Sequence, residues 1–413
     1  MGQFNPLRSA AMGSRAVDRF YEDVRKDARA GKPVAWLLGS LILSPMITSM
    51  DIPWVFGDAL AAHLAARRIQ RKPMEVAEDL GYLVETCSYT RTHMGCSLLS
   101  DEDRAAGPQD WDIPKPDFVI ISDQGCTEWY EWGDDVSKRF GVPMFTVHVP
   151  CVWEGDGREE VAYTVGQLKE MNTFVEDITH RRQNWDKLTD IISVARQAQL
   201  FRDEAQKLCR SVPSPASIFD WATALGAVFN CWGQPESVET YQAMKQEMEE
   251  RVAKGEGAVM GEKYRLAWDG MIVWPMFGHL AKKLAAAGAC TVTSAYMWGF
   301  FPELMSPDNT LESISRNLTE VWCNRSLDFQ IENVTALCQE YGIDGLICHA
   351  HYTCRALCGQ QLELMDAVTR RLGIPGMVLE ADVGDETFYS DAQVDTRLGA
   401  LLETIDARRS RVR

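Results

Sequence analysis

The chain has 413 residues, a formal net charge of −17 and 46% hydrophobic residues. This length exceeds one average domain and the apolar fraction supports sizeable cores, so two or three folded domains are expected rather than a disordered chain. The negative charge argues against a nucleic-acid partner, because its phosphates would be repelled.

The N-terminal region predicts neither a signal peptide nor a membrane span. Residues 1–20 lack a continuous apolar core. Residues 34–50 are apolar, but Gly39, Ser40, Ser44 and Pro45 interrupt them, which favours a buried strand and loop. We therefore expect a cytoplasmic protein with an N-terminal helical arm over 1–30. The twelve cysteines are scattered, and a reducing compartment disfavours disulfides between them.

Residues 31–157 predict a first α/β domain. Strands are expected at VAWLLG (34–39), IPWVF (52–56), FVIISD (118–123) and MFTVHVP (144–150), with helical patterns between them. Strands that alternate with helices indicate a parallel sheet.

Residues 158–265 predict a helical insert, because long helical patterns dominate there. The α/β pattern returns over 266–413, with strands expected at GMIVWP (270–275), ACTVTSAY (289–296), GLICHA (345–350) and MVLEAD (377–382). A helix is expected through 313–341, and another closes the chain. The whole pattern predicts an α/β protein with two flavodoxin-like parallel-sheet domains joined by helical segments.

One unit occurs twice. FVIISDQG is followed by Cys126, and GLICHAHYT is followed by Cys354, so that each buried strand ends in a short loop with a cysteine where a helix begins. This is the carboxyl edge of an α/β sheet, where such folds build their sites. A helix start is also expected to lower a thiol pKa and favour the thiolate. One thiolate from each half, facing a shared cleft, suggests a cofactor held between two similar domains.

A third thiol is needed for a metal site. Cys87, in the polar segment ETCSYTRTHMG (85–95), is the candidate, and Cys96 is the fallback. Three separated thiolates fit either a zinc site with an open position or a [4Fe–4S] cluster with one iron lacking a protein thiolate. The closely spaced Cys348, Cys354 and Cys358 match known metal-ligand spacings only weakly. Five cysteines in apolar helical or strand-like patterns are interpreted as packing residues: Cys209, Cys231, Cys290, Cys323 and Cys338. Cys151, at the end of a strand, fits either a packing or a functional interpretation.

Other side chains near these loops have two interpretations each. His349 and His351 flank the Cys354 loop as proton donors or ligands, or as histidines with structural hydrogen bonds. Trp129, Trp132 and Trp298 either line an aromatic substrate pocket or belong to the core. The sequence contains no dinucleotide fingerprint, no P-loop, and neither the H-E-x-x-H nor the G-x-S-x-G motif.

Three segments together resemble the benzoyl-CoA reductase/2-hydroxyacyl-CoA dehydratase family. They are ETCSYTRTHMG (85–95), PDFVIISDQGCTEWYEW with GVPMFTVHVP (116–150), and HYTCRALCGQQ with GIPGMVLEADVGDETFYSDAQVDTRLGALLE (351–403). The resemblance spans nearly the whole chain and is strongest near the C-terminus, where Asp382-Val-Gly-Asp385, Tyr389-Ser390, Gln393 and Thr396-Arg397 recur in the family order.

The resemblance implies that Cys87, Cys126 and Cys354 hold a [4Fe–4S] cluster between the two domains. It also implies a homologous cluster-carrying subunit and a separate ATP-hydrolysing iron–sulfur activator, which explains the missing P-loop. The substrate implied is an acyl-CoA whose thioester carbonyl is reduced to a ketyl radical. The first expectation is a subunit of a benzoyl-CoA-type reductase that forms a cyclic dienoyl-CoA. The alternatives are a 2-hydroxyacyl-CoA dehydratase subunit, which eliminates water, and a non-catalytic cluster-carrying partner.

The loop after the first strand departs from the family pattern. Family members often carry an acidic residue there, whereas residues 39–48 of this chain contain no carboxylate. Ser40 and Ser44 are then the candidate contacts to the fourth cluster position or to the substrate. The predicted catalytic candidates are therefore Ser40, His349 and His351.

Overall fold

The computed structural model describes residues 2–412 and contains two four-stranded sheets, in which every strand pair is parallel. The first sheet has the order β2-β1-β3-β4 and the second the order β6-β5-β7-β8. Their strands are β1 (Ala35–Leu38), β2 (Trp54–Phe56), β3 (Phe118–Ser122), β4 (Met144–Val147), β5 (Tyr264–Asp269), β6 (Ala289–Thr293), β7 (Gly345–His351) and β8 (Gly376–Ala381). The predicted fold class is confirmed.

The central strands of the first sheet, β1 and β3, are almost entirely apolar because helices cover both faces of the sheet. Every residue of β1, β3 and β5 is buried. Trp36 of β1 is in register with Val119 of β3 and Val55 of β2, which places large side chains on neighbouring strands. These strands form the rigid floor from which the loops at their carboxyl ends project.

Helices flank the first sheet in chain order. They are α2 (Ser44–Ser49), α3 (Gly57–Ala66), α4 (Arg71–Asp79), α5 (Ser88–Ser97), α6 (Asp101–Ala106) and α7 (Glu128–Phe140). Gly141 ends α7 with a φ of 64°, a left-handed conformation that glycine adopts without steric cost.

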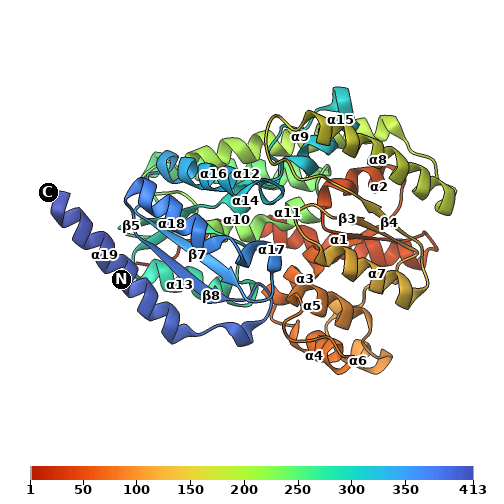
Figure 1. Cartoon of the computed structure of the whole chain (residues 1–413), viewed down its shortest axis with the longest axis horizontal. Coiled ribbons are helices and arrows are strands. Elements are labelled where there is room, and N and C mark those ends of the chain that lie inside the picture. Colours follow the sequence, from red (N-terminus) through yellow and green to blue (C-terminus); the bar gives the residue numbers. More distant parts are fainter. Residues whose placement is uncertain (1, 413) are drawn as a thin grey trace.

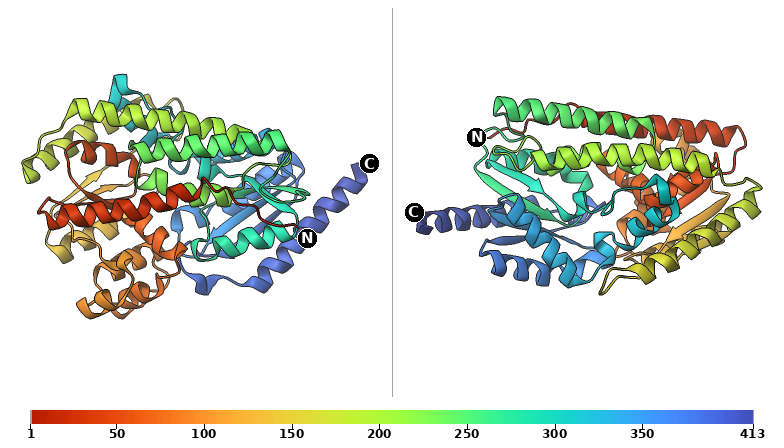
Figure 2. Two further views of the ribbon diagram at one scale, coloured as in Figure 1. Left: turned by 180° about the vertical axis from the view of Figure 1, so that it is seen from behind. Right: turned by 90° about the horizontal axis from the view of Figure 1, so that it is seen from above.

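The expected helical insert consists of α8 (Arg158–Thr179), α9 (Trp185–Leu208), α10 (Ile218–Ala224), α11 (Gly226–Phe229) and α12 (Pro235–Lys254). The helices α9 and α12 pack against each other along the molecule, and α1 (Ala11–Arg29) lies against α10, α11 and α12 (Figure 2). The N-terminal arm thus packs on the body of the same chain. None of the helices within residues 2–412 combines the length and apolarity that crossing a membrane requires.

The second sheet departs from prediction at two places. The strand expected at 270–275 is wrong: the strand is the preceding segment, β5, and residues 274–276 form a single 3₁₀ turn. The helix expected through 313–341 is broken between α15 (Thr310–Thr319) and α16 (Leu327–Glu340), because the Ser326 side chain caps a new helix by accepting a hydrogen bond from the Phe329 N–H at 3.3 Å.

The remaining helices of this half are α13 (Phe277–Ala286), α14 (Ala295–Trp298), α17 (Arg355–Cys358), α18 (Gln361–Leu372) and α19 (Asp391–Val412), whose C-terminal turns extend away from the body (Figure 1). The identical strand orders place one topological switch point between β1 and β3 and another between β5 and β7. Open α/β sheets bind ligands at such points, outside the carboxyl ends of the strands. The site of this protein is built from the loops that leave both.

Candidate functional site

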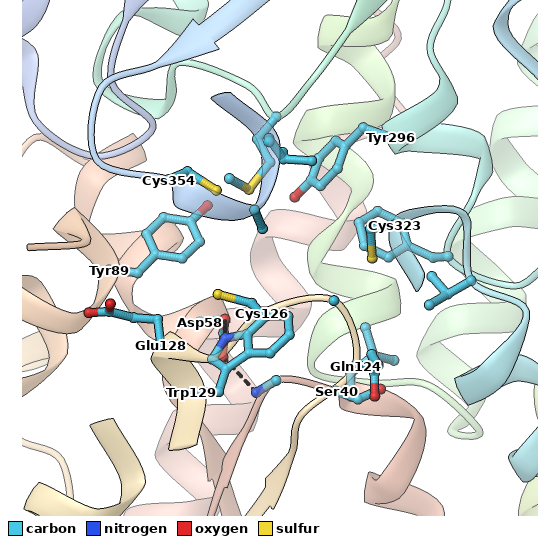
Figure 3. A pocket seen from close by; sticks show the side chains of 18 of the residues that line it. Ser40, Asp58, Tyr89, Gln124, Cys126, Glu128, Trp129, Tyr296, Cys323 and Cys354 are labelled. Carbon is cyan, nitrogen blue, oxygen red and sulfur yellow. Dashed lines mark hydrogen bonds between the residues drawn. The ribbon is translucent and has the colours of Figure 1, made fainter. Parts of the chain in front are cut away.

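A cavity of about 150 Å³ lies between the two α/β domains (Figure 3). The loops after β1 and β3 form one side of it, and the segments that follow β5 and β7 form the other. Its lining includes Ser40, Asp58, Cys87, Tyr89, Gln124, Cys126, Glu128, Trp129, Trp132, Met271, Tyr296, Trp322, Cys323, Cys354 and Leu357. The cavity thus occupies the position that the duplicated sequence unit predicts.

Three of the cysteines in the lining are the predicted metal ligands. Cys87 directly precedes α5, Cys126 lies in the loop between β3 and α7, and Cys354 directly precedes α17. Each side chain is partly accessible through the cavity. The structure therefore brings together three thiols from loops that are widely separated in the sequence.

The expected lowering of the thiol pKa is wrong in its net direction. Burial raises the pKa of Cys87 to about 12 and that of Cys126 to about 11, and it raises the pKa of Cys354 well above its usual value. Backbone N–H groups of Thr90, Glu128 and Leu357 favour the respective thiolates, but burial outweighs them. Cys87 and Cys126 also raise the pKa of Cys354, because negative charges on neighbouring sulfurs repel one another.

This set of donors fits a metal centre. Within residues 2–412, none of the three sulfurs donates a hydrogen bond to another group. Buried thiols that donate no hydrogen bond lose their protons when a metal cation supplies the compensating charge. Three thiolates suit a [4Fe–4S] cluster that leaves one iron without a protein thiolate. Within residues 2–412 the three sulfurs do not all lie within 4.8 Å of one another, a spacing that a single zinc ion would need.

A fourth cysteine, Cys323, also lines the cavity. It lies in the break between α15 and α16. The sequence pattern predicts a continuous helix there, so Cys323 is interpreted as a packing residue from the sequence alone. Gly125 (φ 76°) packs against its backbone, where an added Cβ would lie 2.9 Å from the Cys323 carbonyl oxygen. Figure 3 shows Cys323 beside Tyr296, across the cavity from Cys354. The N-cap signal of Ser326 is the feature of the sequence that could have revealed the break.

Asp58 supplies a carboxylate that the sequence did not assign to the site. It lies in the first turn of α3 and accepts hydrogen bonds from the Gly39 N–H at 3.1 Å and from the Trp129 indole at 2.7 Å (Figure 3). Burial raises its pKa to about 6. The loop after β1 lacks a carboxylate, but Asp58, which follows the adjacent strand β2, places one beside that loop.

Aromatic side chains form much of the remaining wall. Trp129 and Trp132 line the cavity, as one interpretation of the sequence predicted. Trp298 does not, since it packs edge-on against Trp221 with ring centroids 5.1 Å apart. The Tyr296 hydroxyl points into the cavity (Figure 3), whereas the Tyr89 hydroxyl accepts a hydrogen bond from the Trp274 indole. The cavity wall is therefore largely apolar.

Two serines were candidate contacts. Ser40 lines the cavity, and its Oγ accepts a hydrogen bond from the Ile42 N–H at 3.2 Å. Ser44 begins α2, is buried and is not part of the lining.

The two predicted catalytic histidines lie behind the cavity wall. The Met271 N–H donates to Nε2 of His351 at 3.0 Å, and Nδ1 of His349 lies 2.8 Å from the Met271 carbonyl oxygen. Burial lowers the pKa of His349 to about 4 and that of His351 well below its usual value, so both rings are neutral. They hold Met271, a lining residue, in place. A catalytic role for them stays a prediction.

The other cysteine alternatives do not assemble at this site. The fallback Cys96 is buried and points to the Trp111 carbonyl oxygen at 3.7 Å. Cys348 is buried in β7 and Cys358 is exposed, so the two cannot share a local metal knuckle with Cys354.

Comparison with known proteins gives one family. The family model described as 2-hydroxyglutaryl-CoA dehydratase, D-component, matches residues 46–405. The chain is 25% identical over 398 residues to the lactoyl-CoA dehydratase subunit alpha of Anaerotignum propionicum, with 94% of each chain covered. It is 23% identical over 381 residues to the (R)-phenyllactyl-CoA dehydratase alpha subunit of Clostridium sporogenes, covering 92% of this chain and 91% of that one. It is 25% identical over 350 residues to one of the benzoyl-CoA reductase subunits of Thauera aromatica, covering 81% and 80% respectively.

Proposed function

We infer the function from the premise that this chain belongs to the family of the 2-hydroxyglutaryl-CoA dehydratase D-component. We propose that it is a subunit of an ATP-dependent benzoyl-CoA-type reductase, with Cys87, Cys126 and Cys354 as ligands of a [4Fe–4S] cluster. The observation that carries this proposal is the convergence of three thiols from separate loops on one aromatic-lined cavity between the two domains.

The cluster, when bound, would supply low-potential electrons singly to the thioester of an acyl-CoA. The residues of the chain prepare the site for that chemistry. The rings of Trp129, Trp132 and Phe300 surround the cavity with apolar surface, which suits a planar aromatic acyl group and excludes water. The Tyr296 hydroxyl points into this space and is placed to donate a hydrogen bond to a bound oxygen.

Asp58 is the proposed proton-carrying group. Its pKa of about 6 lets it take up and release a proton near neutral pH at little cost, which is the property required of a general acid or base. Hydrogen bonds from Gly39 and Trp129 fix the carboxyl group beside the cavity. Ring reduction needs protons as well as electrons, and Asp58 can deliver them.

A second candidate is a 2-hydroxyacyl-CoA dehydratase subunit. The matches to dehydratase alpha subunits favour it, since they cover more than nine-tenths of this chain. The aromatic lining is compatible with both reactions, because a phenyllactyl group is also aromatic. A non-catalytic cluster-carrying subunit is the third interpretation.

The proposed partners follow from the same premise. The relatives are subunits by their names, so we propose a homologous cluster-carrying subunit for this chain. The absence of a P-loop from the sequence supports an ATP-hydrolysing iron–sulfur activator as a separate protein. We propose that the complex works in the cytoplasm.

Product analysis tests the assignment. The subunit, prepared without oxygen together with its homologous partner and activator, is incubated with ATP and either benzoyl-CoA or a 2-hydroxyacyl-CoA. A reductase yields a product with two more hydrogen atoms than benzoyl-CoA, and a dehydratase yields an enoyl-CoA that has lost water. Turnover that is unchanged when Cys126→Ser replaces the parent chain would leave only the non-catalytic interpretation.

A further inference from the structure

A chain of hydrogen bonds joins the segments that carry two of the three thiols. The Ser88 backbone N–H, one residue after Cys87, donates to the Thr353 hydroxyl oxygen at 3.0 Å. That hydroxyl in turn donates to Oδ2 of Asp382 at 2.6 Å. Thr353 directly precedes Cys354 in the sequence. The two bonds therefore connect a peptide unit of the first domain to a loop of the second, beside both sulfurs.

Asp382 is the final acceptor in this series of hydrogen bonds. It follows β8, the neighbour of β7 in the second sheet, and its side chain is completely buried. Besides the hydroxyl, its carboxylate accepts hydrogen bonds from the backbone N–H of Thr353 at 3.0 Å, Gly384 at 2.9 Å and Asp385 at 3.0 Å. All four partners are donors, so the carboxylate acts only as an acceptor, as the ionised form does.

Close packing reinforces the connection. An added Cβ at Gly384 would lie 2.9 Å from Oγ of Ser88, so the two domains approach closely here and a larger residue would displace the serine hydroxyl. One helical turn beyond Cys87, the guanidinium of Arg91 donates to Asp385 at 3.0 Å. The Cys87 loop is thus held against the loop after β8 at two neighbouring points.

The negative charge of Asp382 also acts on the site. Its carboxylate is buried and lies one hydrogen bond from Thr353, the neighbour of Cys354, which in turn accepts a hydrogen bond from Ser88, the neighbour of Cys87. A buried negative charge opposes an electron added to a cluster bound nearby, and charge and hydrogen bonding near a cluster set its reduction potential.

We propose that Asp382, acting through Thr353, is a positioning residue that fixes Cys87 relative to Cys354 and keeps the reduction potential of the bound cluster low. This inference rests on the proposed function, because it requires a redox cluster on these thiols. Neither residue touches the cavity. Both therefore act through the thiols rather than on substrate.

The geometric half of the proposal is tested on the metal-free full-length protein. Thr353→Val removes the acceptor for Ser88, while Thr353→Ser keeps it. Amide hydrogen exchange is expected to show strong protection of the Ser88 segment in the parent and in Thr353→Ser, and at least a tenfold faster exchange in Thr353→Val. The control is Thr369→Val, which removes a hydroxyl bonded only within α18. Equal exchange rates of the Ser88 segment in all four proteins would show that the hydrogen bonds from Ser88 to Thr353 and from Thr353 to Asp382 do not hold the two segments together.

The electrostatic half is tested on the protein with its cluster, by a redox titration followed by electron paramagnetic resonance. Asp382→Asn is expected to shift the midpoint potential to a more positive value, and Thr353→Val is expected to lose iron to a chelator several-fold faster than Thr353→Ser. An unchanged potential together with equal iron loss would overturn the proposal. Where Asp382→Asn fails to fold, equal rates of iron loss from Thr353→Val and Thr353→Ser would overturn it alone. A parent protein in which the Ser88 segment is protected from exchange, but which binds no cluster, would instead refute the proposed function.

Discussion

The guanidinium of Arg91 in the first domain lies 3.0 Å from the Asp385 carboxylate of the second, and neither side chain has any exposed surface. Arg91 also pairs with Glu78 at 2.6 Å and donates to the Thr86 carbonyl oxygen at 3.1 Å. Burial pushes the pKa of Asp385 upward, but hydrogen bonds from Thr387 and Arg91 outweigh it and hold the pKa below its usual value. This buried ion pair locks the two domains together next to the proposed cluster.

Replacing Arg91 should therefore destabilise the protein strongly. Arg91→Leu leaves the buried Asp385 without its cationic partner, and removal of one member of a buried pair costs about 3–5 kcal/mol. Urea unfolding measures this change. The control is Arg182→Ala, which removes an ion pair whose arginine is 85% exposed and should change stability little. Equal stabilities of the two variants would show that the ion pair does not hold the domains together.

Asp58→Asn should change the pH dependence of stability. The folded-state pKa of Asp58 is about 6, raised by burial from 3.8. The native state therefore binds its proton more tightly than the unfolded state, and the protein loses stability as the pH rises from about 4 to about 6. Asparagine cannot ionise, so the variant should be the more stable protein above pH 6, by up to about 3 kcal/mol.

Urea unfolding of metal-free protein between pH 4 and pH 8 measures this difference. The advantage of Asp58→Asn should vanish toward pH 4, and an advantage that does not vary with pH would show that Asp58 does not have a raised pKa. The same variant should lose about 10²–10⁴-fold in turnover, because it removes the proposed proton carrier.

Tyr296→Phe should weaken catalysis without weakening the fold. Its hydroxyl faces the cavity and forms no hydrogen bond with any group of residues 2–412, so its removal leaves no partner unsatisfied. Loss of one neutral hydrogen bond to substrate corresponds to about a two- to tenfold fall in kcat/KM. Steady-state kinetics and thermal unfolding measure the two effects separately. A large fall in melting temperature would assign the hydroxyl to structure instead.

The ligand assignment makes a set of matched predictions for cysteine variants. Cys87→Ser, Cys126→Ser and Cys354→Ser should each lose iron and colour, whereas Cys338→Ser should keep both. Cys323→Ser is the sharper control, because Cys323 lines the same cavity from the side opposite Cys354. It should also keep its iron. Iron retained in Cys126→Ser but lost from Cys338→Ser would show that the ligands are misassigned.

Much of the fold was predictable because buried parallel strands are continuous apolar runs. The strands at 118–122 and 345–351 and the cysteines that follow them were found in this way, and strand alternation with helices predicted the parallel sheets. The strand at 264–269 was missed because Arg265 and Asp269 make it look polar. Both side chains are nevertheless buried, and Arg265 pairs with Glu262 at 2.6 Å.

The site was predictable only in part, since spatial order is not written along the chain. Asp58 follows the second strand, and nothing local shows that this strand lies beside the first rather than beyond the third. Cys323 was not assigned to the site because the break in the helix was not recognised, and the only local signal of that break is the N-cap residue Ser326. The histidines flanking the Cys354 loop were expected at the site, but the alternation of β7 and the packing of Met271 place them behind its wall.

The most direct test of the account is the content of iron, acid-labile sulfide and zinc in the chain purified without oxygen, alone and with any subunit that accompanies it. The expected result is about four irons and four sulfides per chain, as one cubane cluster requires, with little zinc. Stoichiometric zinc, or little iron after careful anaerobic handling, would contradict the redox function proposed for Cys87, Cys126 and Cys354.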